Sequence, residues 1–278
     1  MIEIKQLKYA YPVGEGQESQ TVLDGVDLQI EKGSFTAILG HNGCGKSTLA
    51  KLLCAVLLPT DGEVLIDGLT TKEEQNILQI RRRVGMVFQN PDNQIVANVV
   101  EEDVAFAPEN LGIPAAEIRK RVDEALAAVG MEEFRLHAPH LLRGGKKQRI
   151  AIAGVLAMEP EVLVLDEVTA MLDPEGRREV LDTVHRLNRE RGMTVLLITH
   201  HMSEVEQADR VIVMEQGKVV MDGKPKEIFP RVEELRGLAL DVPGTVDLLY
   251  ELRRRGWDVP LDALSVEECA DAVCRILQ

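Results

Sequence analysis

The sequence predicts an α/β fold, in which helices cover a mostly parallel sheet. Short apolar runs typical of buried strands alternate along the chain with segments that carry helix start and stop signals. Such alternation is typical of strands joined by helical crossovers. A second observation is a glycine-rich segment, residues 40–47, which separates one of these apolar runs from a helical stretch.

The pattern predicts several short strands. Residues 1–38 alternate apolar and polar positions in short runs, which predicts an antiparallel β region. The later candidates are short and mainly apolar, as expected of strands inside a sheet. They cover residues 35–39, 63–66, 84–88, 162–165 and 195–198, and a hairpin around Gly217 is expected between residues 211–214 and 219–221.

Helices are expected between these strands. One should cover residues 47–58, and another should begin at Pro174, with Asp173 as its N-cap and Gly192 beyond its end. Residues 115–129 form a third helical pattern.

The distribution of helices predicts two units. Residues 1–228 should form the main domain, with a helical subdomain inserted at about residues 91–160. Residues 229–278 should form a small C-terminal helical extension, in which Ser265 and Glu268 have the spacing of a capping box.

Composition limits the partners and the cellular compartment that we expect for this protein. The formal net charge of −14 argues against a nucleic-acid partner. No signal peptide is expected after Met1, and the longest apolar run, residues 150–158, is far short of the roughly 20 residues that span a bilayer. The four cysteines lack paired C-x-x-C spacing, which favours a reducing cytosol. Because no apolar run is long enough to span a bilayer, contact with a membrane would require a partner protein.

The glycine-rich segment fits the phosphate-loop pattern G-x-x-x-x-G-K-[ST]. Its glycines allow a tight turn whose N–H groups cradle phosphate oxygens, and the following helix directs its positive end at the anion. The lysine should reach the β- and γ-phosphates, and the serine should bind Mg²⁺. We therefore expect a nucleoside triphosphate site made of Gly40, His41, Asn42, Gly43, Cys44, Gly45, Lys46 and Ser47.

A pair of carboxylates follows a later apolar strand. The run at residues 162–165 would carry Asp166 and Glu167 to the carboxyl end of the sheet, where ligands bind in open α/β folds. We expect Asp166 to hold Mg²⁺ through water, and Glu167 to orient or deprotonate the attacking water. Two carboxylates can also simply solvate a strand end, but the phosphate loop upstream favours catalysis.

These motifs, with others in the same order, resemble the ATP-binding-cassette (ABC) ATPases over about residues 3–225. The resemblance implies a P-loop NTPase fold with ATP and Mg²⁺ as ligands. It also implies a dimer in which each ATP lies between one chain's phosphate loop and its partner's signature segment. The implied roles are adenine stacking by Tyr11, ATP binding extended to Thr48, metal and water sensing by Gln89, a γ-phosphate contact from His200, a dimer-contact loop at Asp173, and a signature formed by Leu142, Arg143, Gly144, Gly145 and Lys146.

A narrower resemblance is to the ATPase subunits of energy-coupling factor transporters, which import vitamins or transition-metal ions such as cobalt and nickel. Residues 87–95, 103–112 and 252–256 carry it. It implies a peripheral ATPase on the cytoplasmic face of the cell membrane, with three partners: a second ATPase subunit, a transmembrane coupling subunit and a substrate-binding membrane subunit. Acidic residues after Gln89, such as Asp92 and Glu101, would suit arginines of the coupling subunit.

The sequence departs from the family pattern at the signature. Arg143 stands where serine is usual, Lys146 where glutamine is usual, and Val168 where proline usually follows the acidic pair. Arginine is larger than serine and permanently charged, so it should impair the ATP site of the opposite subunit. We therefore expect an asymmetric dimer with a paralogue rather than with a second copy. The alternative is that Arg143 turns to solvent and both sites work.

Other function classes fit less well. An ABC ATPase of DNA repair would carry a long coiled coil, and a translation-associated ABC protein would carry two phosphate loops. The chain has one phosphate loop and no sustained heptads. A degenerate subunit that binds ATP structurally, or the ATPase of another ABC transporter class, stays open as an alternative to an active importer ATPase.

Overall fold

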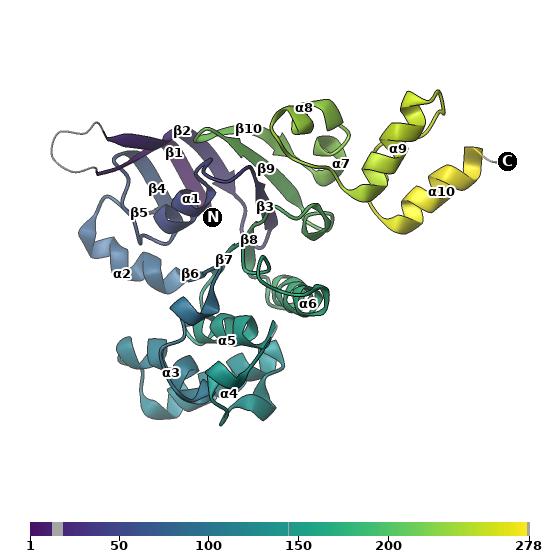
Figure 1. Cartoon of the computed structure of the whole chain (residues 1–278). Coiled ribbons are helices and arrows are strands. Elements are labelled where there is room, and N and C mark those ends of the chain that lie inside the picture. Colours follow the sequence, from purple (N-terminus) through teal and green to yellow (C-terminus); the bar gives the residue numbers. More distant parts are fainter. Residues whose placement is uncertain (13–18, 144, 277–278) are drawn as a thin grey trace.

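The computed structural model describes residues 1–12, 19–143 and 145–276, which form two sheets and several groups of helices (Figure 1). The first sheet is antiparallel and has the strand order β2-β1-β4-β5. Its alternating burial confirms the expected antiparallel region as far as Ile30, whereas residues 35–38, expected in the same region, belong to the second sheet. The strands are β1 (Ile2–Tyr11), β2 (Gln20–Ile30), β4 (Asp61–Ile66) and β5 (Leu69–Thr70).

The second sheet is mostly parallel and has the order β10-β9-β3-β8-β7-β6. Only the terminal hairpin of β9 and β10 runs antiparallel. Every residue of β3, β6, β7 and β8 is buried, which is why these strands have continuous apolar sequences. The strands are β3 (Phe35–Leu39), β6 (Val84–Val87), β7 (Val162–Asp166), β8 (Thr194–Ile198), β9 (Arg210–Glu215) and β10 (Lys218–Gly223).

Three helices form a layer at the bottom of Figure 1, within the region where a helical subdomain is expected. They are α3 (Val100–Asn110), α4 (Ala115–Val129) and α5 (Gly145–Leu156). Short 3₁₀ turns join them to their neighbours: η1 (Pro91–Asn93), η2 (Glu132–Phe134) and η3 (Pro139–Leu141). Apolar residues from all three helices pack together in the largest core cluster.

Two helix boundaries follow the sequence expectation. In α6 (Pro174–Arg191), the N-cap Asp173 accepts a hydrogen bond from Gly176 N at 2.8 Å, and the helix ends at Gly192 with φ 63°. The helix after residue 47 was expected to reach residue 58, which is wrong, because α1 (Lys46–Leu53) stops five residues earlier. Ala55 turns to φ 51°, and its carbonyl accepts two hydrogen bonds from Arg81 of α2 (Glu74–Arg83).

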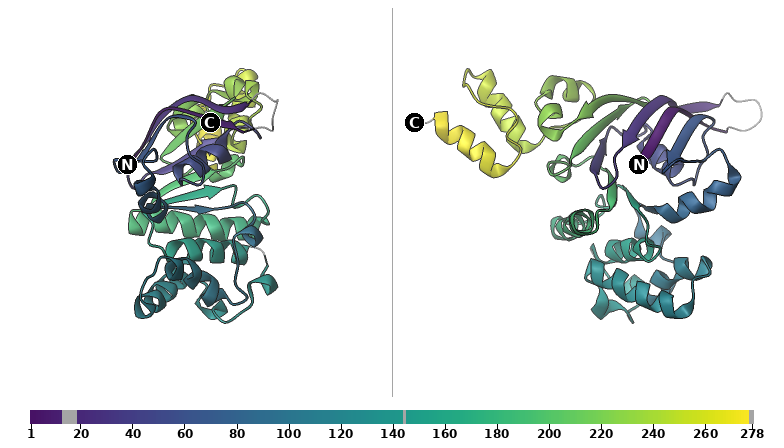
Figure 2. Two further views of the ribbon diagram at one scale, coloured as in Figure 1. Left: turned by 90° about the vertical axis from the view of Figure 1, so that its left-hand side faces the viewer. Right: turned by 180° about the vertical axis from the view of Figure 1, so that it is seen from behind.

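The C-terminal segment is helical, with α7 (Pro225–Ile228), α8 (Val232–Gly237), α9 (Gly244–Arg254) and α10 (Val266–Ile276). Figure 2 shows α9 and α10 extending away from the sheets, where residues such as Leu249 and Cys269 form a small core of their own. Residues 229–246 also contribute to the main core, so the boundary at residue 228 stays a prediction. The expected capping box at Ser265 and Glu268 is confirmed. No helix in the described ranges is long and apolar enough to cross a membrane.

One glycine holds three parts of the chain together. Gly217, in the turn between β9 and β10, donates from its N–H to Cys44 O at 3.0 Å and accepts from Asp24 N at 3.2 Å. Its φ of 75° is left-handed, and an added Cβ would collide with the backbone at Val22. The turn therefore sits against both the glycine-rich segment and β2 only because residue 217 has no side chain.

Gly217→Ala should lower the free energy of unfolding by about 3 kcal/mol, because it adds a backbone collision to an unfavourable φ. The matched control is Gly192→Ala: Gly192 also has a positive φ of 63°, but an added Cβ would meet no atom within 4 Å. That control should cost about 1 kcal/mol. Urea denaturation followed by circular dichroism measures both, and equal losses would contradict the proposed role of the contact.

Candidate functional site

A cleft of about 500 Å³ opens at the carboxyl ends of the parallel strands. It lies where loops after β3, β6 and β7 meet the end of β1, as expected for ligand sites in open α/β sheets. Its lining is formed by Tyr11, Gln20, Val22, Asn42, Gly43, Gly45, Lys46, Ser47, Thr48, Gln89, Asp166 and Glu167.

The glycine-rich loop is shaped by close backbone approach. A Cβ on Gly40 would lie 2.5 Å from both Cys44 Sγ and Met214 O, and a Cβ on Gly45 would lie 2.7 Å from Leu23 Cδ2. Only glycine fits these positions. Cys44 is itself buried against Gly40, which explains a small side chain there, and burial raises the pKa of its thiol.

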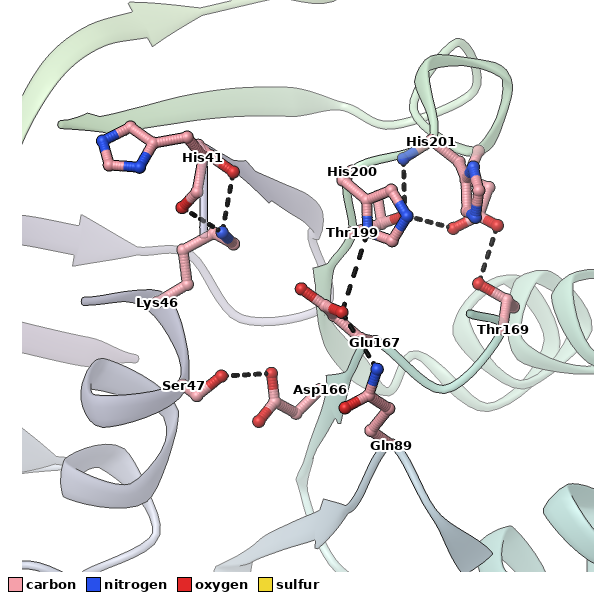
Figure 3. A network of polar contacts seen from close by, with 12 residues as sticks. His41, Lys46, Ser47, Gln89, Asp166, Glu167, Thr169, Thr199, His200 and His201 are labelled. Atoms are coloured by element: carbon pink, nitrogen blue, oxygen red, sulfur yellow. Dashed lines mark hydrogen bonds and ion pairs between the residues drawn. The ribbon is translucent and has the colours of Figure 1, made fainter. Parts of the chain in front are cut away.

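Lys46 folds back across the loop. Its Nζ donates to Gly40 O at 2.7 Å and to His41 O at 2.9 Å, and the residue is only 4% exposed (Figure 3). The loop is also held from the side, since His41 Nε2 lies 2.7 Å from Glu215 Oε2 at the end of β9. A buried ammonium held within a glycine-rich loop at the start of a helix makes this part of the cleft suited to an anion.

Ser47, which follows Lys46 in α1, contacts Asp166 at the end of β7. Ser47 Oγ donates to Asp166 Oδ1 at 2.9 Å, although the two residues are 119 positions apart (Figure 3). Burial raises the pKa of Asp166, and the hydrogen bond from Ser47 partly opposes that rise. A hydroxyl and a carboxylate placed beside the phosphate loop are the oxygen donors that suit Mg²⁺, which takes its remaining ligands from water and phosphate.

Glu167 is the meeting point of three strand ends. Its Oε2 accepts from Gln89 Nε2 at 3.3 Å and lies 3.7 Å from His200 Nδ1, so β6, β7 and β8 each contribute one side chain (Figure 3). Glu167 adopts a left-handed φ of 51°, while its N–H donates to Ile198 O at 3.0 Å. Strained backbone held by a neighbouring strand is a common feature of functional sites.

Tyr11 lines the cleft from the end of β1. Its hydroxyl lies 3.3 Å from Thr48 Oγ1, and its ring packs edge-on against Tyr9 with centroids 4.9 Å apart. Gln20 and Val22 of β2 also line the cleft and were not expected from the sequence. The signal that could have found Gln20 is strand pairing, because it lies opposite Tyr11 in the β1–β2 hairpin.

The four described signature residues take no part in lining this cleft. Leu142 is buried, Arg143 is exposed, and Gly144 lies outside the described residues. Gly145 packs against the N-terminal turn of α6, where an added Cβ would lie 2.8 Å from Gly176 O. Lys146 Nζ lies 4.3 Å from the centroid of the Phe134 ring, a cation–π contact within its own chain.

Asp173 also lies outside the cleft. It is exposed at the start of α6, and its side chain caps that helix. The described parts of the expected site therefore divide into two sets. One lines the cleft or adjoins it, with Gly40, His41 and Cys44 in the same loop and His200 beside Glu167. The other, made of the described signature residues and Asp173, takes no part in the cleft.

Comparison with known proteins agrees with this arrangement. Residues 23–170 match the ABC transporter family. The chain is 53% identical over 276 residues to the energy-coupling factor transporter ATP-binding protein EcfA1 of Clostridium perfringens, which covers 99% of this chain and 98% of the relative. It is 59% identical over 273 residues to EcfA1 of Symbiobacterium thermophilum, covering 97% and 95%.

Solved structures show the same likeness. CbiO1 from Clostridium perfringens, part of the ABC transporter complex CbiONQ, superposes with a TM-score of 0.76 and 39% identity, covering 90% of this chain and 98% of that one. The ATP-binding cassette MJ0796, as a dimer bound to ADP and phosphate, has a TM-score of 0.72 and 33% identity, covering 81% and 98%. The chain belongs to the ABC transporter family and, within it, to the energy-coupling factor transporter ATP-binding proteins.

Proposed function

We propose that this chain is the ATP-binding and ATP-hydrolysing subunit of an energy-coupling factor importer for vitamins or transition-metal ions. The observation that carries the proposal is the convergence of Gln89 and His200 on Glu167, in the region of the cleft that holds Lys46. A carboxylate beside a phosphate loop has the chemistry of an ATPase. The printed names of the relatives supply the class of transporter.

Each side chain has a role that follows from its position. Lys46 and the loop N–H groups bind the β- and γ-phosphates, and Tyr11 supports the adenine. Glu167 accepts a proton from water as the water oxygen bonds to the γ-phosphorus, and the bond to the ADP oxygen breaks. Gln89 and His200 hold the carboxylate and the water in place. Ser47, Asp166 and Gln89 would hold Mg²⁺, which neutralises charge on the phosphates when bound.

The separation of the signature residues from the cleft supports a dimer. Because the signature residues lie away from the cleft, a second cassette would have to bring its own signature to this chain's ATP. The MJ0796 structure is a dimer of such cassettes. The exposure of Asp173 at the start of α6 supports its proposed contact with the second subunit. We expect that subunit to be a paralogue with an intact signature rather than a copy of this chain.

Arg143 is the reason for expecting asymmetry. It is exposed, so in the dimer its guanidinium would face the partner's ATP, where the family pattern has a small hydroxyl. Lys146 is less disruptive, because Phe134 holds its ammonium within this chain. The alternative function, a subunit that binds ATP structurally, rests on the same arginine.

A groove in the helical region is the proposed contact for the membrane coupling subunit, which would hold the chain at the cytoplasmic membrane face. The groove has a volume of about 200 Å³ and includes Phe88, Val96 and Phe106. Val96 is 62% exposed and Phe106 is 49% exposed, so the surface is apolar. Both acidic residues expected to meet a basic partner already have cations of this chain beside them: Glu101 accepts from Arg119 and Arg135, and Asp92 accepts from Lys147 at 2.7 Å.

Glu167→Gln in the assembled transporter should lower kcat for ATP hydrolysis by about 10³-fold, because the amide cannot take the proton. ATP binding should be retained, because the phosphate loop is unchanged. Phosphate release and equilibrium binding of labelled ATP measure the two effects. Glu190→Gln, at an exposed position of α6, is the control. Hydrolysis at the wild-type rate in Glu167→Gln would refute the assigned role.

Arg143→Ser should raise ATP hydrolysis by the assembled heterodimer by about twofold, because a second site becomes competent. Arg82→Ser, at an exposed position of α2, is the matched control. Steady-state hydrolysis and substrate uptake into vesicles should both be recorded. If neither changes, the asymmetric dimer is wrong and Arg143 simply faces solvent.

Phe106→Asp should weaken assembly with the membrane subunit by about 30-fold, as expected when a buried apolar anchor is lost from an interface. Leu78→Asp, which places the same charge on an exposed apolar site of α2, should leave assembly unchanged. Co-purification from detergent-solubilised membranes, with ATP binding as a check on folding, measures the effect. Equal recovery of both variants would remove the groove from the proposal.

A further inference from the structure

We propose that Glu204 is a positioning residue that couples His200 to the loop carrying Asp173, and this role rests on the function proposed above. Glu204 ends the 3₁₀ turn η4 (Met202–Glu204), four residues after His200. Its side chain is fully buried, and it takes no part in lining the cleft. A buried carboxylate outside the phosphate site therefore needs its own explanation.

The two oxygens of Glu204 hold two different segments. Oε2 accepts from Thr199 Oγ1 at 2.5 Å, and Oε1 accepts from Thr169 Oγ1 at 2.7 Å. Thr199 directly precedes His200, and its Oγ1 also accepts from His201 N at 3.0 Å, so it fixes the turn that aims the His200 ring. Thr169 follows Glu167 by two residues, and both threonines are labelled in Figure 3.

A third contact of Glu204 is made by a residue that follows the expected dimer-contact loop at Asp173. Arg177 Nε lies 3.3 Å from Glu204 Oε1 without meeting the geometry of a hydrogen bond, so the contact is ionic. Arg177 lies in the first turn of α6, and its N–H donates to Asp173 O at 2.9 Å. Thr169 and Arg177 stand on either side of the segment with Asp173, so one carboxylate anchors both flanks of that segment.

This arrangement explains why the buried group is charged. A buried carboxylate is tolerated only when donors and a counter-charge offset its desolvation, and here two hydroxyls and one guanidinium do so. Apolar side chains could fill the same space, but they could not join two loops by directed bonds. A displacement of Asp173 by a second cassette would therefore be passed to Thr199 and to the distance between His200 and Glu167.

The test removes one hydroxyl at a time in the assembled transporter. Thr169→Val and Thr199→Val keep the side-chain shape, and each should lower kcat for ATP hydrolysis by about tenfold, in the range found when the groups that orient site residues are lost. KM for ATP should stay within about twofold, because the phosphate loop is untouched. Thr169→Ser and Thr199→Ser keep the hydroxyl and should restore kcat to near the wild-type value.

The double variant separates coupling from stability. If both threonines act through Glu204, Thr169→Val with Thr199→Val should lose little more activity than the worse single variant, whereas independent effects would multiply. Melting temperature, measured in parallel, should fall no further than the lost hydrogen bonds explain, which are one in Thr169→Val and two in Thr199→Val. Glu204→Gln, which loses the ion pair, should show the same drop in kcat if it folds.

Several outcomes would overturn the inference. Valine and serine variants with equal kcat, multiplicative losses in the double variant, or losses of kcat matched by equal losses in ATP affinity would each leave Glu204 a purely structural residue. An active wild type with such results would overturn only the role of Glu204. A wild-type assembly without ATPase activity would overturn the proposed function together with it.

Discussion

The whole site depends on the alignment of the parallel strands β3, β8, β7 and β6. Their register places Ile38 and Asp166 opposite Ile198, and Val87 opposite Leu165, so that all four strands end at one edge. Each strand is followed by polar residues, which therefore gather in one place although they are far apart in sequence. A shift of one residue in any pairing would turn a side chain such as Asp166 to the other face.

The second constraint is that buried charged side chains need polar partners. Each of the three has a different set. Lys46 is held by two loop carbonyls, Asp166 by the Ser47 hydroxyl, and Glu204 by two threonines and an arginine. The first two would exchange their partners for phosphate and Mg²⁺ when ATP binds. The partners of Glu204 are all side chains outside the cleft lining, which is consistent with a positioning role rather than a chemical one.

The signature helix, which would meet the partner's ATP, is connected through this chain to the cleft that would hold its own ATP. Gly145, at the start of the signature helix, touches Gly176 in the first turn of α6. One residue further along, Arg177 reaches Glu204, whose other oxygen holds Thr199 beside His200. In the proposed dimer, a contact made by the signature or by Asp173 is therefore linked by packed groups to the site that hydrolyses this chain's own ATP.

The sequence by itself determined the features that follow local rules: the α/β class, the phosphate loop, the acidic pair at the end of β7, and the ends of α4 and α6. These depend on periodicity, caps and glycine conformations within a few residues. The tertiary structure decided what depends on distant partners: Gln20 in the cleft, the contact of Phe134 with Lys146, the early end of α1 at Leu53, and the role proposed for Glu204. No local pattern encodes such contacts, because the two sides meet only after the sheet and its helices have packed.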